Sequence, residues 1–287
     1  MIGRWTRGVG KVVVGILLAH GLGLRAQWVN PDNFFLKNEG VNGLKLNGGV
    51  MALRIAQYPG SDQSRLMPYP ILFGEWQERM VFGASRFGVG GFLGIKVVKQ
   101  GPWSWWIGGD GVEGIQESKV RAFAGMGDRP ITLYLGSGVE YNEGPLVGVV
   151  ALRKGMTPGS GVAGVLRANG YLPLGRRMVL ELTALAQVVD AQEMRWEFGV
   201  TPEQAARRQA LVDGGDTRIS ASEVGPYAPR GGVATTIFGA SLGYALNEHW
   251  RLGLTINRQS VHGHAQQSPL VRRYGNVVGA FGLSYQL

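Results

Sequence analysis

The sequence is dominated by apolar residues at every second position, a pattern that suits extended strands with two different faces. In ITLYLGSGVEY, residues 131–141, Leu133 and Leu135 share an apolar face, while Thr132 and Glu140 lie on the opposite, mixed face. The alternation predicts antiparallel strands, each with one apolar side to cover.

Such segments follow one another along most of the chain, and Gly-, Pro-, Asn- and Asp-rich turn signals separate many of them. Several have the roughly 9–11 residues that a tilted membrane strand needs. One of the short early segments is expected to be a loop or half of a bent strand. We place the segments at residues 44–57, 66–76, 79–87, 91–99, 103–113, 131–141, 146–156, 161–172, 177–189, 192–199, 231–246, 249–261 and 275–287.

The last of these segments, VVGAFGLSYQL, is alternating and apolar up to the final residue. Phe281, Leu283 and Tyr285 fall on one face, and Ala280 and Ser284 on the other. Because terminal residues usually fray, an apolar terminal strand has to be paired on both edges. Pairing with the first strand would close the sheet into a barrel.

Composition supports packed strands. The 47 glycines recur inside apolar runs rather than in flexible linkers, and glycine is unfavourable in helices. The chain has no cysteine, which excludes disulfides, a thiolate nucleophile and Cys-ligated metals.

The N-terminus predicts export. Arg4, Arg7 and Lys11 precede an apolar stretch from Val12 to Leu24, and Ala26 offers a small residue at a cleavage site, so residues 1–26 are interpreted as a signal peptide and 27–287 as one domain. The alternative is an uncleaved membrane helix, although the stretch is shorter than the roughly 20 residues of a span. Cleavage lowers the net charge from +9 to +5, with 25 Lys and Arg against 20 Asp and Glu. The remaining basic residues are scattered, so no nucleic-acid partner is expected.

Alternating strands also occur in soluble β-sandwiches. Export, the apolar last strand and aromatic residues near strand ends instead favour an all-β transmembrane antiparallel β-barrel of about 12 strands (10–12), closed by the C-terminal strand, in the bilayer of the outer membrane. The candidate girdle aromatics are Tyr69, Trp76, Trp103, Trp105, Trp106, Trp196, Tyr244, Trp250 and Tyr285.

Residues 200–230 are the longest interruption of the strand pattern. Thr201, Pro202 and Glu203 form a helix-start signal, so a short helix is expected there. The rest of this loop is predicted to be irregular, exposed to water and sensitive to protease.

Few residues suggest chemistry, and we expect no catalytic residue, cofactor or metal. His262 and His264 share a strand face, but Cys or carboxylate ligands are not evident beside them. Ser268 would need an oriented base to act as a nucleophile. The glycines of residues 88–94 lack the strand-then-helix context of a phosphate-binding loop and are expected to bend or pack a strand.

Four charged residues are candidates for the lumen: Glu140, Glu181, Arg251 and Arg258. Inward charges would set the selectivity of a channel, or they would pair with one another and fill a narrow lumen. Both interpretations stay open.

Three stretches, in this order along the chain, resemble motifs of the MipA/OmpV family of outer-membrane proteins: QYPGSDQSRLMPYPILF (57–73), EMRWEFGVTPEQAARR (193–208) and LNEHWRLGLTINRQSVHGHAQQSPLV (246–271). Leu287 departs from the family's terminal Phe, and residues 209–224 look like additional loop. The resemblance implies a non-enzymatic scaffold that links a murein hydrolase and a murein synthase. A passive channel or solute-uptake pore, or a surface adhesin, are the alternatives.

Overall fold

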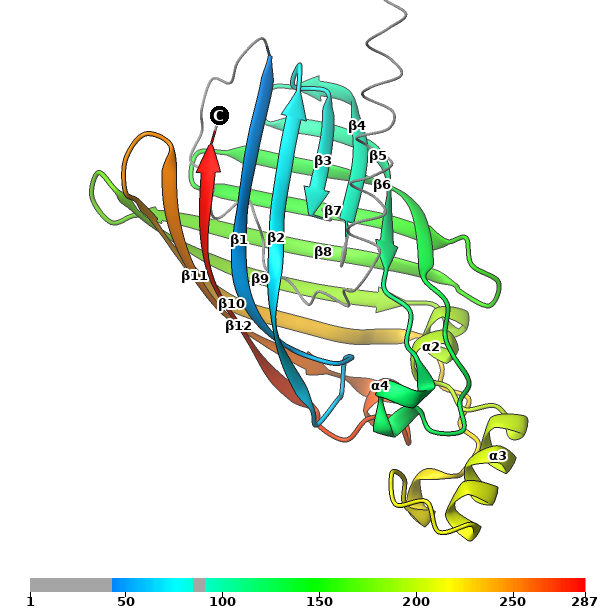
Figure 1. Ribbon diagram of the computed structural model, residues 1–287. Coiled ribbons are helices and arrows are strands. Elements are labelled where there is room, and N and C mark those ends of the chain that lie inside the picture. Colours follow the sequence, from blue (N-terminus) through cyan, green and yellow to red (C-terminus); the bar gives the residue numbers. More distant parts are fainter. Residues whose placement is uncertain (1–42, 85–90, 287) are drawn as a thin grey trace, which may run out of the picture.

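The computed structural model describes residues 43–84 and 91–286, and its strands form one closed antiparallel barrel (Figure 1). The prediction of a signal peptide lies outside these residues. Strand order follows the sequence around the ring, and β1 pairs with β12. The strands are β1 Leu44–Ala56, β2 Ser64–Trp76, β3 Met80–Ala84, β4 Gly91–Gln100, β5 Trp103–Val112, β6 Thr132–Glu143, β7 Leu146–Gly155, β8 Val162–Pro173, β9 Met178–Val189, β10 Gly232–Ala245, β11 Trp250–Val261 and β12 Gly275–Gln286.

The C-terminal strand closes the barrel, as its sequence predicts. Leu283 of β12 lies opposite Val50 of β1 on one side and Leu252 of β11 on the other. Phe281 points outward and is 56% exposed, whereas Ser284 points inward and is 1% exposed. Both edges of the last strand are therefore paired, which leaves no unpaired edge for lipid to cover.

The outer surface of the wall is apolar. The exposed hydrophobic side chains lie at alternate strand positions, so the faces predicted for β6 and β12 are the faces observed. Examples from around the ring are Val50, Leu135, Val150, Leu166, Leu182, Phe238, Ile256 and Phe281, each 46% or more exposed. An outward apolar band of this kind is what a membrane barrel presents to acyl chains.

The two ends of the barrel differ in their connections. At one end the strands are joined by short turns at residues 77–79, 101–102, 144–145, 174–177 and 246–249, and β1 begins and β12 ends there as well. At the other end lie the longer connections, which include residues 57–63, 113–131, 156–161, 190–231 and 262–274. We call these the short-turn end and the long-loop end.

Six of the nine candidate girdle aromatics are exposed on strand segments near the short-turn end: Trp76, Trp103, Trp105, Tyr244, Trp250 and Tyr285. The prediction that the other three belong to the girdle is wrong. Trp106 is 2% exposed on the inner face of β5, Tyr69 packs on an inner cluster of β1, β2 and β12, and Trp196 lies in a helix. The position of a residue along the strand decides its face: Trp105 and Trp106 are adjacent, and only Trp105 points outward.

The segment at 192–199 is not a strand. It forms helix α2, Ala191–Phe198, which Asp190 caps by accepting a hydrogen bond from the backbone N–H of Glu193 at 2.7 Å. Met194 and Phe198, four residues apart, are the buried apolar positions, and that spacing has the period of a helix. The alternation expected from the sequence had the wrong period.

Helix α3, Pro202–Asp213, begins where the sequence predicts it, with Thr201 and Gln204 in a reciprocal capping box. The shorter helical pieces are η3 Glu117–Lys119, η4 Arg121–Phe123, η5 Ala221–Glu223 and α4 Gly263–Gln266. In the described ranges no helix has the length and apolar character needed to cross a membrane. Figure 1 shows α2 and α3 together beyond one end of the barrel.

The long loops pack into a folded cap, so residues 200–230 do not simply protrude into water. Arg208 of α3 is fully buried and donates from Nη1 to the carbonyls of Ala122 and Ala124, at 2.8 and 2.9 Å, and from Nε to the carbonyl of Glu223 at 3.0 Å. An apolar cluster beneath it joins Tyr58, Phe123, Met126, Val200 and Leu270 with their neighbours. We call the packed long loops the cap.

Two glycines show why apolar strands of this barrel are rich in glycine. A Cβ at Gly94 of β4 would lie 2.1 Å from the ring of Phe92, and one at Gly108 of β5 would lie 2.6 Å from the same ring. The ring thus lies flat over both glycines on the inner wall. Gly94 therefore serves close packing rather than phosphate binding.

Candidate functional site: the barrel interior and its cap

An ion-pair network occupies the interior near the long-loop end. Asp110 of β5 accepts a hydrogen bond from Arg153 Nη1 of β7 at 2.9 Å, with side-chain exposures of only 1% and 2%. The Arg153 guanidinium lies 4.2 Å from the ring centroid of Tyr134, whose hydroxyl donates to Glu193 of α2. Glu193 also accepts from the backbone N–H of Gly161 at 2.6 Å. The network therefore fastens the cap to the barrel wall.

A second charged group lies inside the barrel toward the short-turn end. Glu75 of β2 accepts from Lys96 Nζ of β4 at 2.8 Å, and Lys45 Nζ of β1 is 3.9 Å from its other oxygen. The Lys96 ammonium also lies 4.8 Å from the ring centroid of Trp106. The carboxylate of Glu75 is therefore shared by two ammonium groups, and the three side chains together keep one net positive charge.

Between these groups, inward-facing apolar residues of β2 to β5 and of β7 to β10 form a belt on the wall. The belt comprises Phe73, Val81, Phe92, Trp106, Val149, Ala151, Val165, Leu185 and Ile237. Met51, Leu53, Ile55, Ile71, Val278 and Ala280 form a second inner cluster on β1, β2 and β12. Buried polar side chains such as Arg167, Asn169 and Gln187 share this inner face, so the lining is mixed rather than uniformly polar as in a wide, water-filled pore.

Three of the four charges proposed for the lumen lie on the inner face. Glu140 is 4% exposed, Glu181 is 1% exposed and accepts from the amide of Asn169, and Arg251 donates from Nε and Nη2 to Gln286 Oε1, at 3.2 Å each. They sit on β6, β9 and β11 and do not form one cluster.

The prediction that Arg258 faces the lumen is wrong. It is exposed on β11, and its neighbours Asn257 and Gln259 are the buried, inward residues, at 5% and 3% exposure. Arg258 has the same parity as Leu254 and Ile256, which face outward. It therefore lies on the outer face of the wall and not in the lumen.

Sequence reasoning missed Arg167 of β8, which the structure places on the inner face at 6% exposure. It lies between Val149 and Leu185 in the strand register, and its Nε has no hydrogen-bond partner within the described part of the chain. The alternation of VAGVLRANGYLP, which sets Arg167 on the same face as Val165, is the signal that could have identified it. Sequence reasoning also missed Asp110 and Arg153, although the same alternation places them on the inner faces of β5 and β7.

Of the histidines and the serine that invited chemical interpretation, His262 and Ser268 make hydrogen bonds within the packed loops and strands. His262 Nε2 is 2.7 Å from Thr236 Oγ1. Ser268 Oγ donates to the carbonyl of Phe198 at 2.6 Å and accepts from the N–H of Leu270 at 3.1 Å. Across residues 43–84 and 91–286, no group of three or more potential metal ligands occurs.

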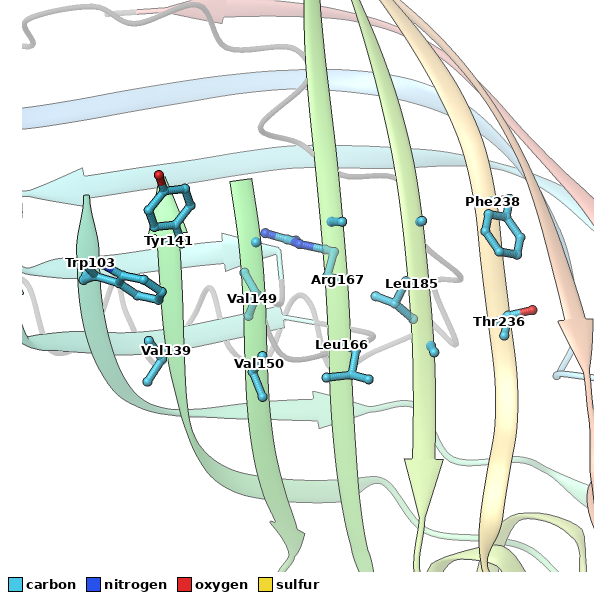
Figure 2. Close-up of a pocket in the computed structure, with 14 residues that line it drawn as sticks. Trp103, Val139, Tyr141, Val149, Val150, Leu166, Arg167, Leu185, Thr236 and Phe238 are labelled. Atoms are coloured by element: carbon cyan, nitrogen blue, oxygen red, sulfur yellow. The ribbon is translucent and has the colours of Figure 1, made fainter. Parts of the chain in front are cut away.

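The outer wall carries a shallow hollow of about 810 Å³ over β5 to β10 (Figure 2). Its floor is made of small residues, Gly148, Ala168, Ala184 and Ala186, and Val150, Leu166 and Phe238 flank it. Trp103 and Tyr141, with ring centroids 4.8 Å apart, stand at one side. Because these side chains are apolar and belong to the outward face, the hollow is suited to acyl chains rather than to polar solutes.

Two further spaces lie in the cap. A groove of about 870 Å³ opens on its surface, and a small cavity of about 40 Å³ lies beneath it, against Tyr134, Arg153 and Gln187. Arg129 and Trp196 line both spaces. They therefore form the partition between the groove and the cavity above the barrel interior.

Comparison with known proteins gives one family. The model of the family described as MltA-interacting protein MipA matches residues 48–287. No curated protein sequence matches.

Solved outer-membrane barrels are similar at low identity. A bacterial polysaccharide outer membrane secretin is 8% identical, with 86% of this chain and 99% of that chain covered and a TM-score of 0.44. The translocator domain of the autotransporter NalP from Neisseria meningitidis is 10% identical, with 99% and 96% covered and a TM-score of 0.38. A porin structure is 10% identical, with 85% and 100% covered and a TM-score of 0.32. At these values the likenesses carry no weight for function.

Proposed function

The chain belongs to the family of the MltA-interacting protein MipA, and we propose that it is a non-enzymatic scaffold that links a murein hydrolase and a murein synthase at the outer membrane. The observation that carries the proposal is the family match over residues 48–287, which includes nearly all of the barrel. The protein itself is an outer-membrane β-barrel, so its part in such an assembly is to hold partners at the membrane.

The architecture suggests which end would hold them. Bacterial outer-membrane barrels have short periplasmic turns and longer extracellular loops. On that rule the short-turn end faces the periplasm, where murein lies, and the cap faces outward. The scaffold surface is then made of the short turns, and the cap has a separate role.

The turn at residues 174–177 is the best candidate contact within that surface. Leu174 is 49% exposed, and the exposed Arg176 and Arg177 follow it. The carbonyl of Arg177 accepts a hydrogen bond from the N–H of Ala245 at 2.8 Å, which holds the turn against the end of β10. An apolar side chain beside two arginines on a fixed turn suits a protein partner, because interfaces favour arginine next to apolar contacts.

The test is crosslinking in living cells. A photoreactive amino acid at Arg176 should capture a murein hydrolase, identified by mass spectrometry, and the same group at Ser222 of the cap should not. A systematic scan of the short turns that captured no murein enzyme would overturn the scaffold.

A second function, a narrow channel, is favoured by one observation: Arg167 is buried on the inner wall with an Nε that lacks a partner in the described residues. Glu140, Glu181 and Arg251 would then shape selectivity. Planar-bilayer recordings separate the two functions. The scaffold predicts no stable unitary conductance, whereas a conductance whose ion selectivity changes in Arg167→Gln would establish the channel.

A further inference from the structure

The groove on the cap is a preformed concavity. Residues of the 113–131, 156–161 and 190–231 connections line it, so only the folded cap creates it. Pro130, Pro158, Pro202 and Pro226 stand in its wall, and proline fixes the backbone angle φ. Its volume of about 870 Å³ is within the usual range of small-molecule sites.

Aromatic side chains give the groove an apolar lining. Phe123, Trp196 and Tyr227 come from three different parts of the cap. Phe123 is 1% exposed, and the Tyr227 hydroxyl donates to the carbonyl of His264 at 2.6 Å, so both are held in place. Trp196 and Tyr227 are only half-buried, so their rings can offer flat faces to a ring-shaped ligand, while Phe123 supports the wall behind them.

Arg129 supplies a positive charge to the groove. Its guanidinium lies 5.0 Å from the centroid of Phe123 and 5.5 Å from that of Trp196, and Nη1 donates to the carbonyl of Glu197 at a long 3.4 Å. Burial lowers the pKa of Arg129 to about 10, although the charge of Glu197 partly offsets the effect. The side chain remains charged at neutral pH, and an anion beside it would be stabilised.

Arg195 supplies a second cation at the rim. Its side chain is exposed and makes no hydrogen bond or ion pair with the described residues. Among the described residues that line the groove, the acidic one is Asp128, which accepts a hydrogen bond from the N–H of Glu117 at 2.8 Å. The lining therefore carries a net positive charge.

We propose that this groove binds a small ring compound that bears a carboxylate, with the ring against the aromatic side chains and the carboxylate paired with Arg129 and Arg195. Arginine pairs with carboxylates through two parallel hydrogen bonds, and the aromatic faces supply the apolar contact. Aryl carboxylates and acidic sugars share this chemistry. The site does not depend on the scaffold function, because it lies at the opposite end of the barrel.

Calorimetric titration of the mature chain, folded in detergent micelles, tests the proposal. The probes are benzoate and galacturonate, each with its neutral counterpart, benzyl alcohol and galactose. At least one acid should saturate a single site about tenfold more tightly than its neutral counterpart. Preference for benzoate identifies an aryl ligand, and preference for galacturonate an acidic sugar.

Variants assign the binding to the groove. Arg195→Gln should weaken the acid by about threefold to tenfold, while Arg121→Gln, an exposed arginine of the same cap outside the groove, should leave the affinity unchanged. Trp196→Leu should weaken the acid and its neutral counterpart together. The proposal fails if neither acid saturates below about 10 mM, if the neutral compounds bind equally well, or if Arg195→Gln behaves like Arg121→Gln.

Discussion

A charge placed on the outer wall should destabilise the protein according to its depth in the membrane. Phe281 is the seventh of the twelve residues of β12, points outward and is 56% exposed. Tyr285, on the same face, is four residues further on, about 13 Å along the strand. At the usual barrel tilt this is about 10 Å in depth, which carries Tyr285 from near the centre of the apolar band to near its edge.

The expected magnitudes follow from these positions. Arginine costs about 2–4 kcal/mol at the bilayer midplane and about 0–1 kcal/mol near the interface. Tyr285 also packs on Trp250, with ring centroids 5.1 Å apart, so its replacement loses that contact as well. We therefore compare Arg with Leu at each position, so that the difference reports the charge and not the lost ring.

The assay is urea-induced unfolding from lipid vesicles, followed by heat-modifiable gel mobility. The difference between Phe281→Arg and Phe281→Leu should be about 2–4 kcal/mol, and that between Tyr285→Arg and Tyr285→Leu about 0–1 kcal/mol. An exposed site on a water-soluble barrel would tolerate either arginine within about 0.5 kcal/mol. Equal costs at both positions would refute the assignment of β12 to the membrane.

Three further predictions concern the cap and the interior. Arg208→Ala removes three hydrogen bonds from a fully buried guanidinium and should lower the unfolding free energy of the cap by at least about 3 kcal/mol. Trypsin should then cleave the β9–β10 loop faster while the barrel stays intact. An unchanged cleavage rate would contradict this prediction. Partial burial raises the pKa of Glu223, but hydrogen bonds, chiefly from Arg272, outweigh this and hold it below its usual range. Its stabilising contribution is therefore present above about pH 4.3 and is lost at lower pH, so the protection factors of cap amides, which correct for the intrinsic exchange rate at each pH, should fall on acidification in the wild type and lose this pH dependence in Glu223→Gln. Ser284→Arg should lower the yield of folded barrel, because Ser284 is 1% exposed and lies opposite Arg251. Ser284→Ala should fold normally. Equal yields of the two variants would contradict this prediction, because the lumen would then have space and a counter-charge for an arginine at this position.

The barrel wall was predictable because strand faces depend on local alternation. In β6, β9, β11 and β12 the period of two assigns both faces correctly. The same rule puts Arg258 outside with Ile256, so its assignment to the lumen came from charge and not from parity. A charged residue near a strand end is tolerated on the outer face, since the cost of arginine falls toward the interface.

The cap was not predictable, because its stability comes from contacts between distant loops. Arg208 bonds to carbonyls of Ala122 and Ala124, which are 86 and 84 residues away in sequence. Nothing in the polar sequence around Arg208 indicates that its side chain is buried. The groove and the Asp110–Arg153 pair likewise depend on which strands and loops become neighbours, and the closed barrel alone determines that.

Orientation in the outer membrane is tested most directly by labelling single cysteines in intact cells. The chain has no cysteine of its own, so Ser222→Cys in the cap and Arg176→Cys in the 174–177 turn each provide one site, and both positions are exposed. A membrane-impermeant maleimide should label Ser222→Cys in intact cells, and Arg176→Cys only after the outer membrane is permeabilised. Labelling of Arg176→Cys in intact cells, with Ser222→Cys protected, would place the short turns outside and remove the basis for a periplasmic scaffold.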